Sequence, residues 1–572
     1  MVGDCAGSRV PARASRAPAA SAKRNGFTSG GLNLALVSFR AMRSSLALLS
    51  LLLVSSRAAA QTEKRIPVGS EVFAGSELES YLRVLQVRGI VPEQPWSLRP
   101  FSPPELARLA PPDSGHPWAG RYRFRSDQRG SLAPMRPGVN IVANTTFPYG
   151  HNDGAVWAGR GATLVADGGF HAQRGALSLT LDPIAFVAQN AAFRLMPNQD
   201  PTVSPYADPV YGAEIDLPQR FGNRPYAVLD PGQSTLRLDA GGVALGISTA
   251  NEYWGPAREF PIILGNNAAG IPRAFVGTAR PLDLSVVQLS ARVIWGRLSQ
   301  SAYSPDSVAG GLRFGTGAVA VLGSRYVPGL EIGACRFAHL YWPGRALSLN
   351  DFLYPLSSQN RAHLAGTERD NQLASIFFRW NPPRSGFEVY GEYGRDDFLL
   401  DRRELAEELD RDGGYTIGFQ KVWGSGRQLH AIRAELHDLQ PSALAQGRGV
   451  FPFYIHSPFV RQGHTERGQL LGSYAGFGGG GGIAAFETYY PGGRWTLSWT
   501  RILQRQRGAF FPDSIIDPRG LDVMHALSWN ALFFRGRYDI TTSATLVYEF
   551  NRDFRADYVN LNATFGVRAF WR

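Results

Sequence analysis

The end of the chain alternates between apolar and polar side chains with almost no interruption. From residue 558 to residue 572 every second position is apolar, and the positions between them are mostly polar or glycine. The apolar positions are Val559, Leu561, Ala563, Phe565, Val567, Ala569 and Trp571, and the others include Asn560, Asn562, Thr564, Gly566 and Arg568. Successive side chains of a strand point to opposite faces, so this pattern predicts a long strand with one apolar and one polar face.

The same alternation recurs upstream, over residues 287–295, 495–499 and 538–550. Strands of a soluble β-sandwich average about five or six residues, whereas some of these runs are roughly twice that length. A wall between lipid and water accounts for both the length and the alternation. The pattern therefore predicts an all-β transmembrane protein, an outer-membrane β-barrel.

Strand candidates begin near residue 138 and number about eighteen, and single-chain bacterial barrels have an even number of strands. The candidates are 138–148, 155–171, 175–190, 234–241, 242–250, 284–300, 307–323, 326–341, 371–381, 386–397, 413–423, 427–438, 465–477, 482–490, 493–503, 522–534, 537–550 and 556–571. We therefore expect residues 138–572 to form an antiparallel barrel.

Short turns with glycine or proline alternate with long polar connections along this region. The long connections are at about 191–233, 251–283, 342–370, 398–412, 439–464 and 504–521. In outer-membrane barrels the short turns face the periplasm, and the long loops face outside or fold into the lumen. We therefore expect functional residues in the long loops.

Residues 61–137 have a helical rather than a strand period. Ser76 and Ser102 are each followed three residues later by glutamate, which is the pattern of a capping box. Apolar residues at helical spacing follow both boxes. These features predict a small periplasmic helical region that plugs or caps the barrel.

The first sixty residues have the pattern of an export signal that starts late. Met42 and Arg43 precede the apolar run 46–54, and Ala58-Ala59-Ala60 follows it as a small-residue cleavage site. We predict a signal peptide over residues 42–60, with residues 1–41 an upstream extension that is not translated. Cleavage would remove eight basic residues and one acidic residue from a chain of formal charge +12, leaving +5.

A charge of +5 with no basic stripe does not indicate a nucleic-acid partner. Only Cys335 remains after cleavage, so no internal disulfide is expected. The sequence also lacks a Gly-x-Ser-x-Gly elbow, a phosphate-binding loop and a His-Glu-x-x-His helix. No cofactor, metal or enzymatic activity is therefore predicted.

Several blocks of the sequence resemble one family of outer-membrane proteins. The blocks are Asp230–Ser234, Asn251–Pro256 and Ile263–Ala268, together with residues 215–222, 388–394 and 463–472. They are similar to the signature blocks of Wzi-type capsule assembly proteins. That resemblance implies an eighteen-stranded barrel that acts as a lectin, holding capsular or other extracellular polysaccharide on the cell, without being the export conduit and without enzymatic activity.

The partners expected on this basis are the polysaccharide, outer-membrane lipid and, during insertion, the barrel-assembly machinery, with the protein as a monomer. Sugar sites combine aromatic platforms with amide or guanidinium hydrogen-bond donors. The candidate polysaccharide-binding residues are Glu252, Tyr253, Trp254, Arg258, Asn266, Asn267, Arg273, Glu392, Arg467 and Gln469.

Other interpretations of the same residues remain open. Trp254 and the following Gly255-Pro256 could only shape a loop that folds inward. Glu388 and Glu392 share one strand face, and such a pair could serve glycoside hydrolysis or could brace the wall in an Arg–Glu network. The alternatives at the level of function are a porin or sugar-uptake channel, and a barrel hydrolase acting on glycan or lipid.

Overall fold

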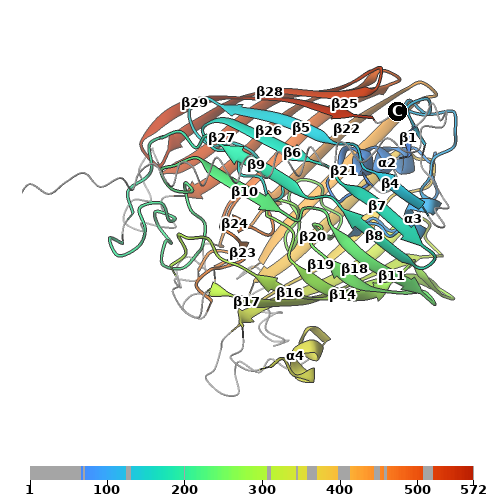
Figure 1. Ribbon diagram of the computed structural model, residues 1–572, viewed down its shortest axis with the longest axis horizontal. Helices are drawn as coiled ribbons and strands as arrows, with labels where there is room; N and C mark the ends of the chain where they lie inside the picture. The colour runs from blue at the N-terminus through green and yellow to red at the C-terminus, as the bar shows by residue number, and fades with distance from the viewer. Residues whose placement is uncertain are drawn as a thin grey trace, which may run out of the picture. The chain divides into compact units, whose positions relative to one another are not determined.

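The computed structural model is dominated by one antiparallel sheet that closes into a barrel. Figure 1 shows the long strands side by side around an interior that contains further segments. The structure describes residues 66–67, 71–123, 131–198, 200–305, 311–342, 346–356, 370–396, 413–442, 451–455, 460–506 and 520–570. The predicted upstream extension 1–41 and signal peptide 42–60 lie outside the described residues.

The barrel strands follow one another around the sheet in chain order. They are β4 (Ser131–Pro134), β5 (Gly138–Asn144), β6 (Gly161–Asp167), β7 (Phe170–Arg174), β8 (Leu177–Leu181), β9 (Ile184–Ala188), β10 (Tyr226–Asp230), β11 (Thr235–Ala240), β12 (Val243–Ser248), β14 (Arg273–Thr278), β15 (Leu282–Leu284), β16 (Val287–Leu298), β17 (Arg313–Ser324), β18 (Leu330–Tyr341), β19 (Asp370–Trp380), β20 (Phe387–Asp396), β21 (Gly413–Ser425), β22 (Gln428–Asp438), β25 (Gly480–Tyr490), β26 (Gly493–Gln506), β27 (Leu521–Arg535), β28 (Tyr538–Arg552) and β29 (Ala556–Ala569).

Closure comes from pairing of the last strand with one of the first. β29 pairs antiparallel with β5, from Asn562 opposite Asn144 to Arg568 opposite Gly138. Five strands are interrupted by short breaks, so that β4 and β5, β6 and β7, β8 and β9, β10 and β11, and β14 and β15 are halves of single strands, because each half pairs with the corresponding half next to it. Counted in this way, the described residues form eighteen barrel strands.

The alternation seen in the sequence separates the two faces of the wall. On β29, Leu561 and Phe565 are both 54% exposed on the outside, whereas Asn560 is fully buried on the inside. Large exposed apolar side chains recur on the other strands, among them Ile332, Ile376 and Leu527. This is the architecture of outer-membrane β-barrels, and it confirms the predicted fold class.

Three details differ from the sequence-based expectation. The predicted strand 465–477 is wrong, because this segment contains only the small hairpin of β23 (Thr465–Glu466) and β24 (Gln469–Leu470). In the described residues these two strands pair with each other and are not part of the barrel sheet. Conversely, β10 and β14 are wall strands within segments that were predicted to be long loops, and β4 extends the barrel before residue 138.

The predicted helical region packs against the inside of the wall. It contains α2 (Glu77–Val87) and α3 (Pro103–Arg108), with Ser76 and Ser102 as N-caps that accept the backbone N–H groups of Glu79 and Glu105 at 3.2 Å. Apolar residues of α2 form one buried cluster with wall residues of β21, β22, β25 and β27. None of the helices in the described part of the chain is both long and apolar enough to span a bilayer.

This region binds the tight turns at one end of the barrel. Arg88 Nε donates to the carbonyl of Gly424 at 2.9 Å, Trp118 Nε1 donates to that of Gly493 at 3.0 Å, and Arg121 Nη1 donates to that of Gly536 at 2.6 Å. These carbonyls lie at three separate short turns. We call residues 71–123 the plug, because they fill the short-turn end of the lumen.

An arginine on the lipid-facing side of β29 should destabilise the folded barrel. We expect Leu561→Arg to lower the free energy of unfolding by about 2–4 kcal/mol, because the guanidinium would lose its hydration in lipid. Thr564→Arg is the matched control, since Thr564 faces a polar cavity inside the barrel. Urea unfolding in lipid vesicles measures both values, and equal losses would contradict the assignment of the two faces.

Candidate functional site

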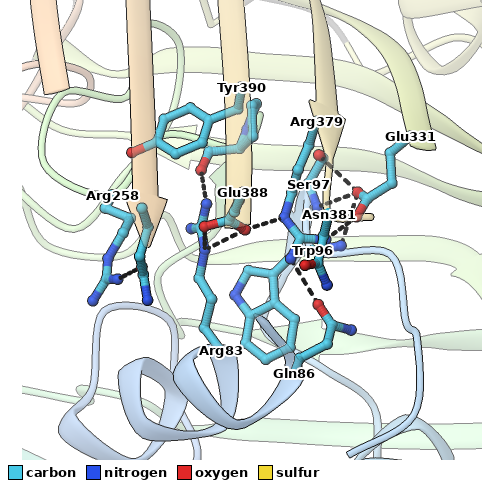
Figure 2. A network of polar contacts seen from close by, with 12 residues as sticks. Arg83, Gln86, Trp96, Ser97, Arg258, Glu331, Arg379, Asn381, Glu388 and Tyr390 are labelled. Carbon is cyan, nitrogen blue, oxygen red and sulfur yellow. Dashed lines mark hydrogen bonds and ion pairs between the residues drawn. The ribbon is translucent and has the colours of Figure 1, made fainter. Parts of the chain in front are cut away.

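The plug is fixed to the wall by a buried network of arginine and glutamate side chains (Figure 2). Arg83 of α2 donates from Nε to both carboxylate oxygens of Glu388 on β20, each at 3.1 Å. Arg379 on β19 bonds the same carboxylate and also Glu331 on β18. Both arginines and Glu388 are at most 1% exposed at their side chains. We call these four residues the plug lock.

Each end of the plug lock makes further contacts with the plug. Glu331 Oε2 accepts the backbone N–H of Trp96 at 2.8 Å and that of Ser97 at 3.1 Å. Arg379 Nη2 donates to the amide oxygen of Gln86 at 2.7 Å. Glu388 is thus held between two guanidinium groups, which favours the bracing network over a catalytic pair of carboxyl groups.

The binding loop was predicted at residues 251–283, and in the structure it is the connection 249–272 between β12 and β14. It folds into the lumen and packs on the plug. Its short strand β13 (Tyr253–Trp254) pairs with β2 (Leu98–Arg99) of the plug. Arg99 donates from Nη2 to the carbonyls of Gly255 and Ala257 at 3.0 and 2.8 Å, and its guanidinium lies 4.4 Å from the centre of the Tyr253 ring. The loop is therefore an internal element and not an exposed surface loop.

Trp254 is completely buried in this arrangement. Its indole N–H donates to Glu252 Oε2 at 2.7 Å, and its ring lies so close to Gly317 on the wall that a Cβ there would be 2.7 Å away. A glycan cannot reach such a side chain. The expectation that Trp254 offers a sugar platform does not fit this placement, which agrees with the alternative that Trp254 shapes an inward loop.

Glu252 and Arg273 form an ion pair that joins the inward loop to the wall. Arg273 lies on β14, and its Nη2 is 2.7 Å from Glu252 Oε1, while Arg292 Nη1 on β16 is 3.0 Å from the same oxygen. Burial alone raises the pKa of Glu252, but the two guanidinium groups outweigh burial and hold that pKa below its ordinary value. Glu252 is therefore ionised, and its carboxylate is bonded to both arginines.

Most of the other predicted residues connect internal segments to one another. Asn267 donates to the carbonyl of Leu470 at 3.1 Å, and Gln469 donates to that of Asn267 at 3.2 Å. Arg467 bonds Asp230 and Glu466. The contacts of Asn267 and Gln469 hold the loop 249–272 against the hairpin β23–β24, and Arg467 joins this hairpin to β10 of the wall.

Glu392 on β20 is 3% exposed and lies directly against Gly255. A Cβ at Gly255 would be 2.6 Å from Glu392 Oε2, and this glycine has φ of +105°. Both the close approach and the backbone conformation require glycine at this position. Glu392 is therefore enclosed by the folded loop.

A cavity of about 640 Å³ remains between these internal segments and one side of the wall. Of the predicted binding residues, Tyr253, Arg258 and Asn266 line it, and the others do not. The wall strands β5, β6, β9, β22 and β25–β29 line it on one side, and the plug and the inward loops line it on the other. We call this space the lumenal cavity.

On β26–β29, the lining of the lumenal cavity consists mainly of small hydroxyl and amide side chains. They are Thr496, Ser498, Thr500, Ser528, Asn530, Thr541, Ser543, Thr545, Asn562 and Thr564. None of them is among the binding residues predicted from the sequence. Most of them are nevertheless polar positions of the alternating runs, and this pattern could have identified them. Four adjacent strands thus present donors and acceptors at a spacing fixed by the sheet.

Charged and aromatic groups line the rest of the cavity, and they come from the wall strands β22, β25 and β26 as well as from the plug and the inward loops. Arg494 holds Glu77 with two contacts of 2.7 and 2.8 Å, and Arg433 lies 2.8 Å from Glu259 and 2.9 Å from Glu487. The side chain of Arg258 bonds Gln420. Tyr149, Tyr253, Tyr474 and Tyr489 also line the cavity.

His151 adds a neutral imidazole to the lining of the cavity. Its ring stacks on that of Tyr474 with centres 4.2 Å apart, and burial lowers the pKa of His151 to about 4. Its Nε2 atom has no hydrogen-bond partner among the described residues. Within the same ranges, no group of three or more His, Cys, Asp or Glu side chains is arranged to hold a metal ion.

Comparison with solved structures finds this fold in Wzi, an outer-membrane protein involved in group 1 capsule assembly in Escherichia coli and described as a carbohydrate-binding β-barrel. The alignment covers 87% of this chain and 99% of Wzi, with a TM-score of 0.58 and 15% identity. The resemblance expected from the sequence is thus confirmed at the level of the fold.

Two Pseudomonas aeruginosa proteins align less well. OccK3 (OpdO) covers 76% of this chain and 96% of its own, with 11% identity and a TM-score of 0.36. OprD covers 77% and 96%, with 8% identity and the same TM-score of 0.36. Scores this low support no conclusion about this chain. No family model and no curated protein matches the sequence.

The ion pairs of Glu252 should make stability depend on pH. We expect Glu252→Gln to lower the free energy of unfolding at pH 7 by about 3–5 kcal/mol, because it leaves two buried guanidinium groups without their carboxylate. Since the pKa of Glu252 is lower in the folded state, its contribution is complete above the unfolded pKa of about 4.3 and is lost as the pH falls through the folded value.

The difference between wild type and Glu252→Gln should therefore shrink as the pH falls from 5 towards 3, in unfolding curves recorded in detergent. Asp283→Asn is the control, because Asp283 pairs with Arg325 where both side chains are exposed. A difference between wild type and Glu252→Gln that stays constant down to pH 3 would show that Glu252 is not held by these arginines.

Proposed function

We propose that this protein is an outer-membrane glycan-binding barrel that anchors or assembles capsular or extracellular polysaccharide at the cell surface. The main support for the proposal is that the plug fills part of the lumen and leaves a polar cavity, lined by hydroxyl, amide, guanidinium and tyrosine groups. The fold shared with a carbohydrate-binding barrel supports it. The proposal includes export through a cleaved signal peptide and function as a monomer.

The lumenal cavity has the chemistry that a sugar ring requires. A sugar has hydroxyl groups around its edge and apolar C–H faces, so it needs many hydrogen-bond partners beside aromatic rings. Wall residues such as Asn530 and Ser543 can supply the hydrogen bonds, and Tyr149 and Tyr474 can supply the rings. Its volume of about 640 Å³ lies within the usual range for ligand pockets, about 300–1,000 Å³.

The plug supports a binding function over free diffusion. The plug lock joins α2 to three neighbouring wall strands, and the inward loop 249–272 adds a second layer through Arg99. A porin or sugar-uptake channel is the second candidate, and the cavity along β26–β29 is the observation that favours it. A hydrolase has less support, because Glu388 is held by two arginines.

Filling the lumenal cavity should weaken glycan binding without disturbing the plug. We expect Ser543→Trp to weaken binding of the purified protein to its polysaccharide at least tenfold, or about 1.4 kcal/mol, since the indole would occupy the sugar's place. Cells carrying this variant should release polysaccharide into the medium. The measurements are a binding isotherm and the ratio of cell-bound to released polysaccharide.

Ala544→Trp is the matched control, because Ala544 is the next residue on β28 and faces outward. It should retain polysaccharide as the wild type does. Both variants must keep the heat-dependent gel migration of a folded barrel. If Ser543→Trp folds and retains polysaccharide fully, the lumenal cavity is not the binding site.

A further inference from the structure

One connecting segment lies on the outside of the barrel rather than above it or within it. Residues 346–356, which we call the strap, contain α4 (Leu349–Leu353) and the 3-10 helix η3 (Tyr354–Leu356). Figure 1 shows α4 outside the wall next to β17. Trp295 on β16 donates from Nε1 to the carbonyl of Phe352 at 2.8 Å, and the two rings meet edge to face with centres 5.7 Å apart.

Alternation along the strands shows that the strap covers the lipid-facing side. On β16, Arg292 and Ile294 point inward, where Arg292 meets Glu252, so Trp295 points outward. On β17, Arg313 points inward and donates to the carbonyl of Gly463 at 2.7 Å, so Phe314 points outward. Phe314 is nevertheless only 2% exposed.

The covering residues come from the segment after β18. Trp342 packs edge to face on Phe314 with ring centres 5.7 Å apart, and η3 packs against β17 and β18. Ala338 on β18 is outward, because its neighbour Phe337 points inward to His464, and yet it is 1% exposed. Toward the long-loop ends of β16–β18, the outward faces of these strands therefore contact protein where they would otherwise contact lipid.

A polar cluster lies between the strap and the outward face of β18 and β19, where direct contact with lipid would be unfavourable. Arg336 on β18 and Gln372 on β19 point outward and are bonded to each other. The guanidinium of Arg336 lies 5.6 Å from the centre of the Tyr354 ring, and Gln372 Nε2 donates to the Tyr354 hydroxyl at 2.9 Å. Asp370 accepts from both Tyr354 and Gln372. An arginine that faces lipid is unfavourable because its guanidinium loses hydration, and this cost increases toward the bilayer midplane, so cover by Tyr354 is stabilising.

The other side of the strap is apolar and exposed. Leu349 is 72% exposed, Phe352 38%, Leu353 47% and Leu356 64%. The outward side chains of the neighbouring strands are also apolar and exposed, among them Ile332 at 54% and Leu322 at 41%. In water four such side chains would form an unfavourable patch. Trp295 lies near the long-loop end of β16, where aromatic side chains of barrels lie at the membrane interface.

We infer that the strap is a lipid-facing element, which lies in the outer half of the bilayer against β16–β18 and places Leu349, Phe352, Leu353 and Leu356 among lipid acyl chains. It replaces a polar area of the wall with an apolar one, and it seals Arg336 and its partners from lipid. Its partner is the hydrocarbon of the membrane. This inference depends on insertion of the barrel but not on glycan binding.

Spin labels on the strap test the inference directly. In a full chain with Cys5→Ser and Cys335→Ser, labels are attached at Leu353→Cys and, in a second protein, at Leu356→Cys. Each protein is reconstituted in phosphatidylcholine and phosphatidylglycerol vesicles. Oxygen concentrates in the acyl region and a nickel chelate stays in water, so their relative effects on the label's relaxation report its surroundings.

Two further positions calibrate the measurement. Ile332→Cys reports the lipid-facing wall, and Arg427→Cys reports water, because Arg427 is exposed on the turn between β21 and β22. We expect both strap labels to relax more with oxygen than with nickel, as at Ile332. If both folded proteins relax more with nickel, as at Arg427, the strap faces water and the inference is wrong. A protein partner would then be the better explanation of its apolar surface.

Discussion

Lipid offers no hydrogen bonds to a peptide group, and this constraint determines the rest of the structure. Every backbone group of the wall must pair with a neighbouring strand, so the sheet has to close, as β29 does on β5. Closure places one face of every strand in lipid and the other in an enclosed lumen. Apolar side chains therefore lie outside, and the interior of the barrel carries Arg, Glu, Asn, Ser and Thr.

A polar lumen has to be filled by water or by protein, and in this chain protein fills a large part of it. The plug and the loop 249–272 meet the charged part of the wall, where Arg83, Glu388 and Arg379 satisfy one another. A buried ion pair adds little net stability, but removal of one partner is costly, by about 3–5 kcal/mol. Such a network fixes where the plug lies. The lumenal cavity remains where the inward side chains of β26–β29 are mostly small hydroxyl and amide groups.

The barrel could be predicted from the sequence because its signal is local. Alternation along 556–571 or 537–550 needs no knowledge of the rest of the chain, and the structure has strands at both places. The same rule failed at 465–477, where the alternating side chains are buried by the inward packing of a hairpin instead of facing lipid. The rule also missed β14, because its short alternating run follows a long irregular loop. Capping residues Ser76 and Ser102 likewise gave the helix starts correctly.

The site was harder to predict, because its position depends on how distant segments dock. Trp254 is the type of side chain that is expected to stack on a sugar ring, but the sequence does not distinguish a loop that faces outside from one that folds inward. Alternation places Ser543 and Asn562 on the polar faces of their strands, but which polar residues line a cavity and which contact the plug depends on contacts such as that of Arg83 with Glu388. The strap shows the same limit, since alternation predicts lipid around Phe314 where the structure has protein.

A barrel that is closed by its own plug should pass no steady ion current, and single-channel recording in planar bilayers measures this current. We expect the wild-type protein to give no stable ohmic openings, and Arg83→Ala combined with Glu388→Gln to give them, because the plug would lose its attachment to β20. Steady openings of the wild-type protein under the same conditions would show that the plug does not close the lumen.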